Sequence, residues 1–457
     1  MPTGQAPVVP EWKKVLRLHL GLLITAILSF SFVQALGVSF WTLFHLFLAC
    51  YLPTIMVGSL EAIVTFARNA SPARGWDEPH SGPPSATFIV PAYLPNEVGI
   101  ILHTLQHLLT QVDRPEGLFQ VILAYNSPVA LPIEQELAEL AVREPVLRVM
   151  KVNDSHSKAE NLNAALAIAE GEITVVIDAD HRPRRDCLWR AWRWLAQGYD
   201  AVQGRTVVRN GDRGLLSALA SVEFEVTYAV SHFGKSILTD TGIFAGQNGY
   251  WRTPVLREIG FDPDMLTEDI DVTVRAQCRG HRIVVDRSLF SDELAPERGR
   301  DLWYQRKRWA QGWMQVALRH QMLVMQSLHL NSMQKAYWTY MLGWQEVQRL
   351  TTHLILPLII SAWMLTGTVF WPVSMPLVLV LVFGTISLSL QLVAAYRNRV
   401  EPWPLRRFVG YFLAAFLYVT VKNTIALVAL RDQIMGERRW VVTPRGADND
   451  STMAVKS

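Results

Sequence analysis

Cysteine is scarce in this chain of 457 residues. Its three cysteines, Cys50, Cys187 and Cys278, lie far apart, and none belongs to a Cys-x-x-Cys pair. This spacing argues against a disulfide framework and against a zinc site. We therefore expect three reduced thiols that serve as packing residues.

A strong net charge, an internal repeat and a low-complexity segment are missing as well. The formal net charge is only +3, so whole-molecule charge favours no particular partner. Arginines at positions 182–193 are mixed with the tryptophans at 189, 192 and 194, which we interpret as a face toward anionic lipid or substrate. No nucleic-acid partner is expected.

Apolar residues are abundant instead, because half of the chain is hydrophobic and 16 residues are tryptophan. The long apolar runs are 16–36, 40–66, 350–370, 373–395 and 408–430. The first run is longer than the core of a signal peptide, and the second follows almost at once. We therefore predict an N-terminal transmembrane hairpin rather than a cleavable leader.

Basic residues flank these runs and predict their orientation. Lys13, Lys14 and Arg17 precede the hairpin and Arg68 and Arg74 follow it, so both of its ends are expected in the cytoplasm. The chain is accordingly predicted to be a multi-pass protein of the inner (plasma) membrane, in contact with membrane lipids, with the region between the two groups of apolar runs in the cytoplasm.

The last apolar run does not fit a simple span. It carries Lys422 and Asn423 at mid-length, which is costly in lipid unless they face protein or water. Arginines lie on both of its sides, and the positive-inside tendency places both flanks in the cytoplasm. Segment 408–430 is therefore re-entrant or interfacial, or one of the other spans is misplaced.

Between the two apolar regions the pattern becomes that of an α/β domain. Residues 69–84 are rich in proline, glycine and polar residues and are predicted to be a linker. Strands are predicted at 87–90, 119–124, 147–152 and 173–177, and helices at 96–109, 133–142 and 157–169. This alternation predicts right-handed βαβ units and a mostly parallel sheet. Three polar segments, 91–93, 125–127 and 178–180, end predicted strands, where such sheets bind ligands.

Beyond residue 206 the chain is predicted to be mainly helical, with helices at 215–231, 270–279 and 302–318. The predicted divisions are a transmembrane hairpin (1–68), a linker (69–84), a cytosolic α/β domain with interfacial helices (85–330), C-terminal transmembrane helices (331–430) and a cytosolic tail (431–457).

Two carboxylates end the apolar run 173–177. Asp178 and Asp180 are alternate residues of an extended segment, so both can address one ion. Mg²⁺ or Mn²⁺ bound there would neutralise a diphosphate leaving group. His181 is a further ligand or a supporting partner. The alternative is that these aspartates only form a turn before the helix near Asp186.

Three motifs in the order 178–180, 267–269 and 305–309 resemble those of the family-2 inverting glycosyltransferases, which build β-linked glycans at membranes, such as cellulose, chitin and hyaluronan synthases. The resemblance covers roughly residues 85–320. It implies that residues 85–330 are a GT-A-type α/β glycosyltransferase domain, with a UDP-sugar donor and Mg²⁺ or Mn²⁺ as cofactor. Because nucleotide sugars are cytosolic, it also implies that this catalytic domain is cytoplasmic.

The resemblance also implies a donor site. Pro91 and Tyr93 match the first strand end, which lines the nucleotide base. Asn126 stands where the family commonly has aspartate, and its carbonyl can still accept a bond from uracil. Lys158, in a stretch similar to Lys-Ala-x-Asn-x-Asn, is implied to contact the diphosphate or base, together with Asp178. The alternative for Lys158 is a solvated lysine at a helix start.

The catalytic motif is Thr267-Glu268-Asp269. The resemblance implies that Asp269 is the general base and that Glu268 orients it. The same residues also suit a helix N-terminus, and both roles are compatible. Gly246, in the loop 243–249, would allow close backbone approach to the acceptor, although an ordinary glycine turn is an alternative.

The third motif matches Gln-x-x-Arg-Trp at Gln305, Arg308 and Trp309. The resemblance implies that Trp309 stacks on the acceptor sugar, that Gln305 binds the acceptor and that Arg308 braces the diphosphate. An interfacial belt of Trp303, Trp309 and Trp313 is the alternative. Residues 440–445 resemble a short gating segment of bacterial cellulose synthase.

The implied function is transfer of glucose or N-acetylglucosamine from its UDP donor to form β-glycosidic bonds. Two acceptors stay open: a growing polysaccharide in a processive synthase, or a membrane lipid that receives one sugar, as in glucosyl-diacylglycerol synthases. The non-enzymatic alternative is a membrane scaffold with an inactive transferase domain. The sequence does not predict the oligomeric state.

Overall fold

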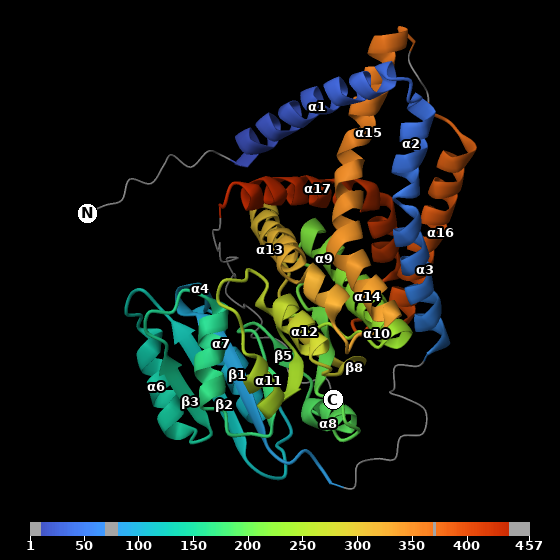
Figure 1. Ribbon diagram of the computed structural model, residues 1–457. Helices are drawn as coiled ribbons and strands as arrows, with labels where there is room; N and C mark the ends of the chain where they lie inside the picture. The colour runs from blue at the N-terminus through green and yellow to red at the C-terminus, as the bar shows by residue number, and fades with distance from the viewer. Residues whose placement is uncertain (1–10, 69–80, 369–371, 438–457) are drawn as a thin grey trace.

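The computed structural model describes residues 11–68, 81–368 and 372–437. An α/β part lies at one end, and a group of long helices rises from it (Figure 1). The gating-like segment 440–445 and most of the predicted linker 69–84 lie outside the described residues.

One sheet of eight strands forms the centre of the α/β part, in the order β3-β2-β1-β4-β7-β6-β8-β5. The strands are β1 (Ala86–Tyr93), β2 (Phe119–Asn126), β3 (Leu147–Lys151), β4 (Ile173–Val176), β5 (Arg182–Pro183), β6 (Ala201–Val208), β7 (Gly249–Arg252) and β8 (Ile283–Glu293). β1 to β4 pair in parallel, as predicted. β7 is antiparallel to β4 and β6, and β5 is antiparallel to β8, so the other half of the sheet is mixed.

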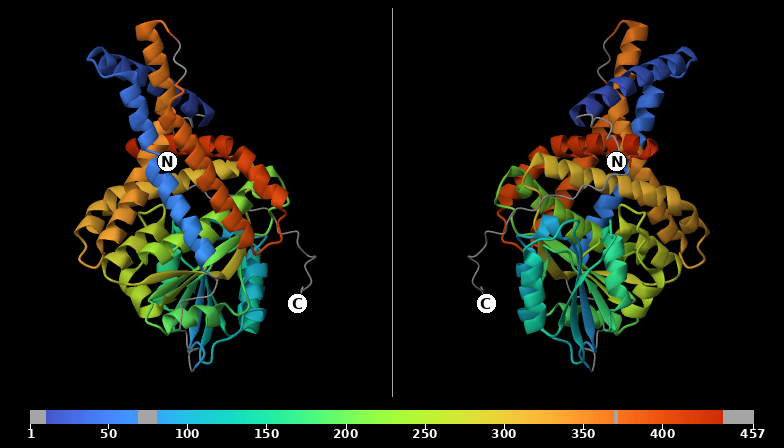
Figure 2. Two further views of the ribbon diagram at one scale, coloured as in Figure 1. Left: turned by 90° about the vertical axis from the view of Figure 1, so that its right-hand side faces the viewer. Right: turned by 90° about the vertical axis from the view of Figure 1, so that its left-hand side faces the viewer.

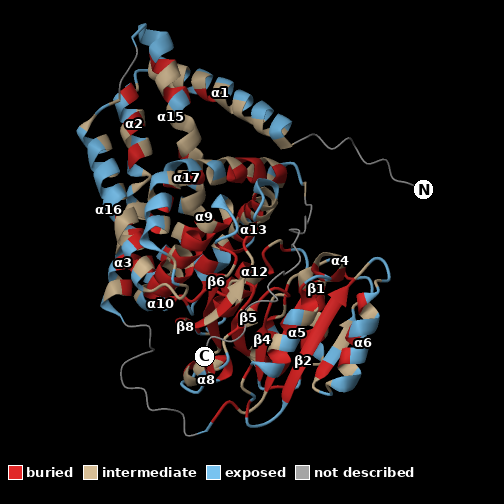
Figure 3. Cartoon of the chain, turned by 180° about the vertical axis from the view of Figure 1, so that it is seen from behind, coloured by how far each residue is buried: buried red, intermediate tan, exposed pale blue. Residues whose placement is uncertain are grey.

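Helices cover both faces of this sheet because successive side chains of a strand point to opposite sides. In β1, Phe88 and Val90 belong to one buried cluster, while Ile89 belongs to another. The first cluster includes α5 (Ile101–Thr110), α6 (Ile133–Arg143) and α8 (Cys187–Leu195), and the second includes α7 (Lys158–Ala167), α11 (Thr253–Ile259) and α12 (Glu268–Cys278). The strands are therefore buried on both faces, as Figure 3 shows.

A second group of helices lies between the sheet and the far end of the molecule (Figure 2). It contains α1 (Glu11–Ala35), α2 (Phe40–Ala49), α3 (Leu52–Ala67), α9 (Leu215–Phe224), η1 (Glu225–His232), α10 (Phe233–Thr239), α13 (Gly299–Gln326), α14 (Ser332–Thr339), η2 (Tyr340–Trp344), α15 (Gln345–Thr366), α16 (Met375–Arg397) and α17 (Leu405–Ile434). Short α4 (Leu94–Glu97) follows β1. η1 and η2 are π-helical turns within longer helices.

Five of the described helices are long and apolar enough to cross a membrane. They are Glu11–Ala35, Phe40–Ala67, Ser332–Thr366, Met375–Arg397 and Leu405–Ile434. Their large apolar side chains are extensively exposed, which is expected of surfaces that face lipid rather than water.

α17 differs from its neighbours in direction and in its polar contacts. Its C-terminal part lies across α15 instead of along it, and it packs on α13 (Figure 1). Lys422 Nζ donates to Glu223 Oε1 at 2.7 Å, and Asn423 Nδ2 donates to Thr352 Oγ1 at 3.2 Å. The two polar residues in the middle of this apolar run thus have protein partners.

Candidate active site

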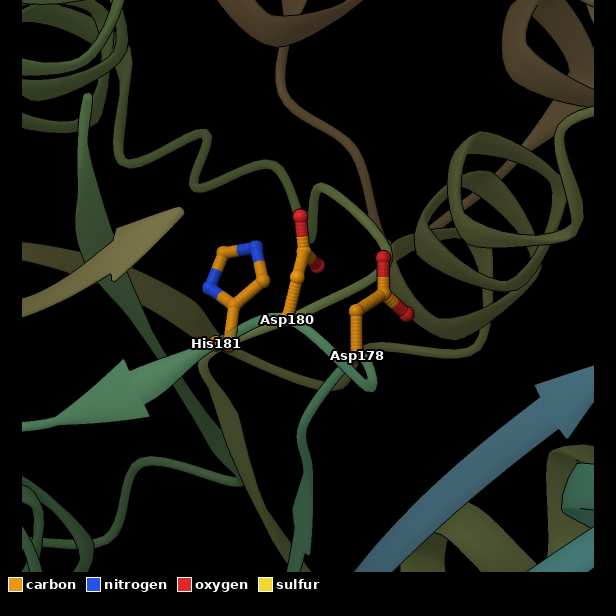
Figure 4. A group of neighbouring side chains, drawn as sticks. All are labelled: Asp178, Asp180 and His181. Atoms are coloured by element: carbon orange, nitrogen blue, oxygen red, sulfur yellow. The ribbon is translucent and has the colours of Figure 1, made fainter. Parts of the chain in front are cut away.

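Asp178 and Asp180 lie just beyond the carboxyl end of β4. The strand ends at Val176, where its last pairings with β1 and β7 are made, and the chain then turns. Figure 4 shows the two carboxylates side by side and pointing the same way. Asp178 is half-buried, while Asp180 is 2% exposed. The sequence-predicted pair is therefore brought together at a ligand-binding edge of the sheet.

These residues fit a hard divalent cation. One potential ligand atom from each of Asp178, Asp180 and His181 lies within 4.8 Å of the others. Carboxylate oxygens are the donors that Mg²⁺ and Mn²⁺ prefer. The ring of His181 is fully buried and already engaged, because Nδ1 lies 3.1 Å from Ser291 Oγ and Nε2 lies 2.8 Å from Glu293 Oε2. This arrangement favours the supporting role for His181 over direct ligation.

Lys158 connects the 178–180 motif, the 267–269 motif and the glycine loop 243–249. It is the first residue of α7, whose start is fixed by a capping box of Ser157 and Glu160. Its Nζ lies 2.6 Å from Asp178 Oδ1 and 3.4 Å from Glu268 Oε1, and donates to Gly246 O at 2.8 Å. Burial lowers the pKa of Lys158, but the surrounding carboxylates outweigh it and raise the pKa above its usual range. A charged lysine therefore lies at the centre of the site.

The predicted base-binding residues lie at adjacent strand ends, where Tyr93 pairs with Asn126 in the β1–β2 register. Asn126 is buried, donates from Nδ2 to Ser155 O at 3.0 Å, and accepts at Oδ1 from Asn161 Nδ2 at 2.9 Å. Asn161 also donates to Ala92 O at 3.2 Å. Asn126 thus helps to hold this edge together, and its carbonyl keeps one further lone pair for a ligand.

Asp269 lies in the first turn of α12. Its Oδ1 accepts from the Ile270 backbone N–H at 2.9 Å. Burial and the neighbouring Glu268 carboxylate raise the pKa of Asp269 to about 7, against the opposing effects of Lys158 and Arg308. A carboxyl with a pKa near neutrality suits a general base. Thr267 occupies the N-cap position of α12 without a side-chain capping bond.

Gly246 lies against this aspartate. Its φ is +82°, and a Cβ added there would lie 3.0 Å from Asp269 Oδ2. The loop after Phe244 therefore passes close to the predicted base, and both the backbone conformation and the available space require glycine.

The Gln-x-x-Arg-Trp motif lies on α13. Arg308 Nη1 is 3.4 Å from Leu266 O, in the loop before α12. The Trp309 ring lies 6.4 Å from the Phe224 ring, and the guanidinium of Arg306 is 4.3 Å from the Trp309 ring centroid. Gln305 Oε1 is buried without a hydrogen-bond partner in the described part of the chain, so it has an accepting position for a ligand.

Two positioning contacts were not predicted. Asn163 exchanges two hydrogen bonds with the backbone of Phe261, which fixes the approach to α12. Asp271, fully buried, accepts from His320 Nε2 at 2.6 Å and thereby ties α12 to α13. Asn163 was visible as part of the Lys-Ala-x-Asn-x-Asn stretch. Asp271 and His320 are 49 positions apart, and no local pattern connects them.

Two family models match the chain. The model described as glycosyl transferase family group 2 matches residues 173–425, which is more than half of the chain. The model described as glycosyl transferase family 2 matches residues 87–249. Together these matches cover the sheet, the three motifs and most of the helices that follow.

Curated relatives include a probable glycosyltransferase, YdaM, of Bacillus subtilis, 25% identical over 281 residues, which cover 61% of this chain and 64% of the relative. The poly-β-1,6-N-acetyl-D-glucosamine synthase of Staphylococcus aureus is 24% identical over 240 residues, 46% of this chain and 57% of the relative. The chain thus spans less than two thirds of the length of these relatives.

A solved structure with a similar fold is the mannosyltransferase PcManGT from Pyrobaculum calidifontis, determined in complex with GDP-Man and Mn²⁺. It is 20% identical, has a TM-score of 0.55, and covers 86% of this chain and 100% of its own. The similarity confirms the predicted GT-A-like α/β fold.

Proposed function

Because the chain belongs to glycosyl transferase family group 2, we propose that it transfers a sugar from a nucleotide donor to a hydroxyl acceptor with inversion, as a membrane-bound synthase of a β-linked polysaccharide. The observation that carries this proposal is the position of Lys158. One ammonium group contacts Asp178 on the donor side and Glu268 beside the predicted base. The acidic motifs therefore form one site, which argues against an inactive scaffold.

The donor would be bound at the edge formed by β1, β2 and β4. Asp178 and Asp180 would hold Mg²⁺ or Mn²⁺, which neutralises the diphosphate as it leaves. Lys158 and Arg308 add positive charge beside the same group. Tyr93 and Asn126 lie where the base is expected.

Asp269 would take the proton from the attacking hydroxyl of the acceptor. Its pKa of about 7 allows it to be ionised before attack and protonated after it. One displacement at the anomeric carbon, on the face opposite the leaving diphosphate, inverts the configuration. Glu268 bonds to Lys158 and thereby holds the start of α12 against the donor side. Trp309 and Gln305 would contact the acceptor sugar.

The proposed donor is UDP-glucose or UDP-N-acetylglucosamine. The similarity to a poly-N-acetylglucosamine synthase supports the second sugar. PcManGT was determined with GDP-Man, so GDP-mannose is the donor against which the two UDP-sugars should be compared.

We further propose that α1 rises through the plasma membrane, α2 and α3 return, α15 rises and α16 returns, with α17 at the cytoplasmic interface. Support comes from the direction of α17 across α15 and from its exposed apolar residues, which include Phe416 at 85% exposure. An even number of crossings puts both ends of the chain in the cytoplasm, which agrees with the arginines around α17.

The test is product formation by the purified full-length chain in lipid nanodiscs. Labelled UDP-glucose, UDP-N-acetylglucosamine and GDP-mannose are supplied in turn, with Mg²⁺ or Mn²⁺. We expect a retained high-mass polymer from one UDP-sugar, whereas a solvent-extractable glycolipid would support the lipid acceptor instead. Asp180→Ala should abolish metal-dependent turnover, and Asp264→Ala, on the exposed loop before α12, should not. No transfer from any donor would overturn the proposal.

A further inference from the structure

Glu223, near the end of α9, is a buried carboxylate outside the three motifs. It accepts three hydrogen bonds from two other helices. Arg306 Nη2 of α13 donates at 2.6 Å, and Lys422 Nζ and Tyr418 OH of α17 donate at 2.7 and 2.8 Å. Burial raises the pKa of Glu223, but Arg306 and Lys422 outweigh it and lower the pKa to about 2. The group is therefore a permanently charged anchor for two cations.

Arg306 connects this anchor to the acceptor side of the site. Its guanidinium lies 4.3 Å from the centroid of the Trp309 ring and 5.6 Å from that of Phe224. The Trp309 and Phe224 rings are stacked at 6.4 Å with an interplanar angle of 28°. Trp309 is only half-buried and packs against a buried cluster that includes Phe224. Arg306 is the cation that lies against its ring, and it therefore contributes to the position of that ring.

We infer that Glu223 is a positioning residue for acceptor binding: it holds Arg306 against Trp309 and links this tryptophan to α17 through Lys422 and Tyr418. The inference rests on the proposed function, because it requires Trp309 to contact the acceptor. It goes beyond that function by making the geometry of the acceptor site depend on the helix that lies across α15.

The direction of the effect follows from the charges. Glutamine at position 223 keeps the size of the side chain but leaves two cations close together in a buried place. Arg306 is then repelled by Lys422 and loses its fixed position over Trp309. Acceptor binding weakens, while Asp178, Asp180 and Lys158 are untouched, so hydrolysis of the donor by water is preserved.

A matched control exists elsewhere in the same molecule. Glu61 of α3 is also a buried carboxylate beside one lysine and one tyrosine, since it is hydrogen-bonded by Tyr337 and lies 4.0 Å from Lys235 Nζ. It joins α3 to α10 and α14, and among the described residues it forms no hydrogen bond or ion pair with Trp309 or Arg306. Glu61→Gln therefore reports the general cost of neutralising a buried carboxylate at a helix junction.

The experiment measures Glu223→Gln, Lys422→Met and Glu61→Gln in nanodiscs, with the preferred sugar nucleotide. The acceptor is a β-linked gluco- or N-acetylgluco-oligosaccharide, or diacylglycerol in the disc, according to which the wild type uses. We expect Glu223→Gln to raise the acceptor KM roughly ten- to hundredfold with donor hydrolysis within about twofold of wild type. Lys422→Met should give a smaller shift in the same direction, and Glu61→Gln should leave the acceptor KM unchanged.

A double-mutant cycle with Trp309→Ala separates positioning from general damage. If Glu223 acts through Trp309, Glu223→Gln adds no further increase in acceptor KM in the Trp309→Ala background. An unchanged acceptor KM in Glu223→Gln, additive effects in the cycle, or an equal effect of Glu61→Gln would overturn the inference while leaving the proposed transfer intact. Absence of transfer in the wild type would instead remove the proposed function and this inference with it.

Discussion

At the residue scale, the state of one carboxyl decides whether the site can work. Asp269 must be ionised to accept a proton, and its pKa is raised to about 7 by burial and by Glu268. Below that pH the group is protonated and cannot act as a base. We therefore expect kcat/KM for transfer to fall about tenfold per pH unit below pH 7 and to level off above it.

The measurement is a pH profile of transfer beside a profile of donor binding, both in the wild type and in Asp269→Asn. The variant should bind donor normally and lose transfer at every pH. A wild-type profile that stays flat between pH 5 and pH 8 would contradict the role of Asp269, because its carboxyl has a pKa of about 7.

Gly246 offers a second prediction at this scale. Alanine at φ +82° costs about 1–2 kcal/mol in backbone strain, and its Cβ would also press on Asp269 Oδ2. We expect Gly246→Ala to lose at least tenfold in kcat. Gly198→Ala is the matched control, because its φ is +88° and nothing lies within 4 Å of an added Cβ.

Thermal unfolding and turnover are compared for the two alanine variants. Similar losses of stability are expected, because the strain is alike, with a loss of turnover in Gly246→Ala alone. Equal turnover in both variants would show that the close approach of residue 246 to Asp269 does not affect catalysis.

At the element scale, α13 is held to α1 and α17 by a buried group of charges. Asp432 is 2% exposed at its side chain and lies 2.6 Å from Lys307 Nζ and 3.8 Å from Lys14 Nζ. Removing the charge of Asp432 leaves both lysines without their buried partner. Asp432→Asn should lower the free energy of unfolding by about 3 kcal/mol, as breaking a buried ion pair does.

Glu437→Gln is the control, because Glu437 bonds to Lys14 and Arg431 with 37% of its own side chain exposed. Its loss should cost less than about 1 kcal/mol. Thermal unfolding in detergent measures both, and the exchange Lys307→Asp with Asp432→Lys should recover part of the stability. Equal melting temperatures for the two single variants would contradict a stabilising role for the buried charges around Asp432.

The elements that the sequence predicted are stabilised by residues within the element, whereas those it did not predict depend on partners far away in the sequence. β1, β2 and β4 are continuous apolar runs, so composition alone predicted them and the ligand-binding edge they form. β6 carries Gln203 and Arg205 in its middle, and both are buried. Their partners are distant, since Gln203 donates to Gln247 O and Arg205 pairs with Glu225. A short stretch of sequence does not contain both a buried polar residue of β6 and the distant partner that satisfies it.

The same reason explains the candidate site. Asp178, Asp180 and Asp269 were predicted because each begins or follows a recognisable element. The sequence does not predict the partner of Lys422, because that partner, Glu223, lies 199 positions away. Contacts of this kind are formed only by the folded chain.

At the scale of the whole molecule, we predict that both ends of the chain lie on the cytoplasmic side of the membrane. If α17 lay across the membrane as a fifth span, residues 438–457 would be outside the cell. The partners of Lys422 and Asp432 argue against this, because Lys422 is held by Glu223 of α9 and Asp432 by Lys307 of α13. If α17 moved into lipid, charged side chains would lose these partners in a medium where an unpaired charge is costly.

We therefore expect the N-terminus and the C-terminus to be cytoplasmic. The measurement places a single cysteine at position 3 or at position 455 of a chain without its own three cysteines and labels it in intact cells with a membrane-impermeant maleimide. Neither site should react until the membrane is permeabilised, whereas a cysteine in place of Gly37, in the turn between α1 and α2, should react at once. Labelling of position 455 in intact cells would instead require that α17 spans the bilayer, and the link from α17 to Trp309 would then have to be formed within the membrane rather than at its surface.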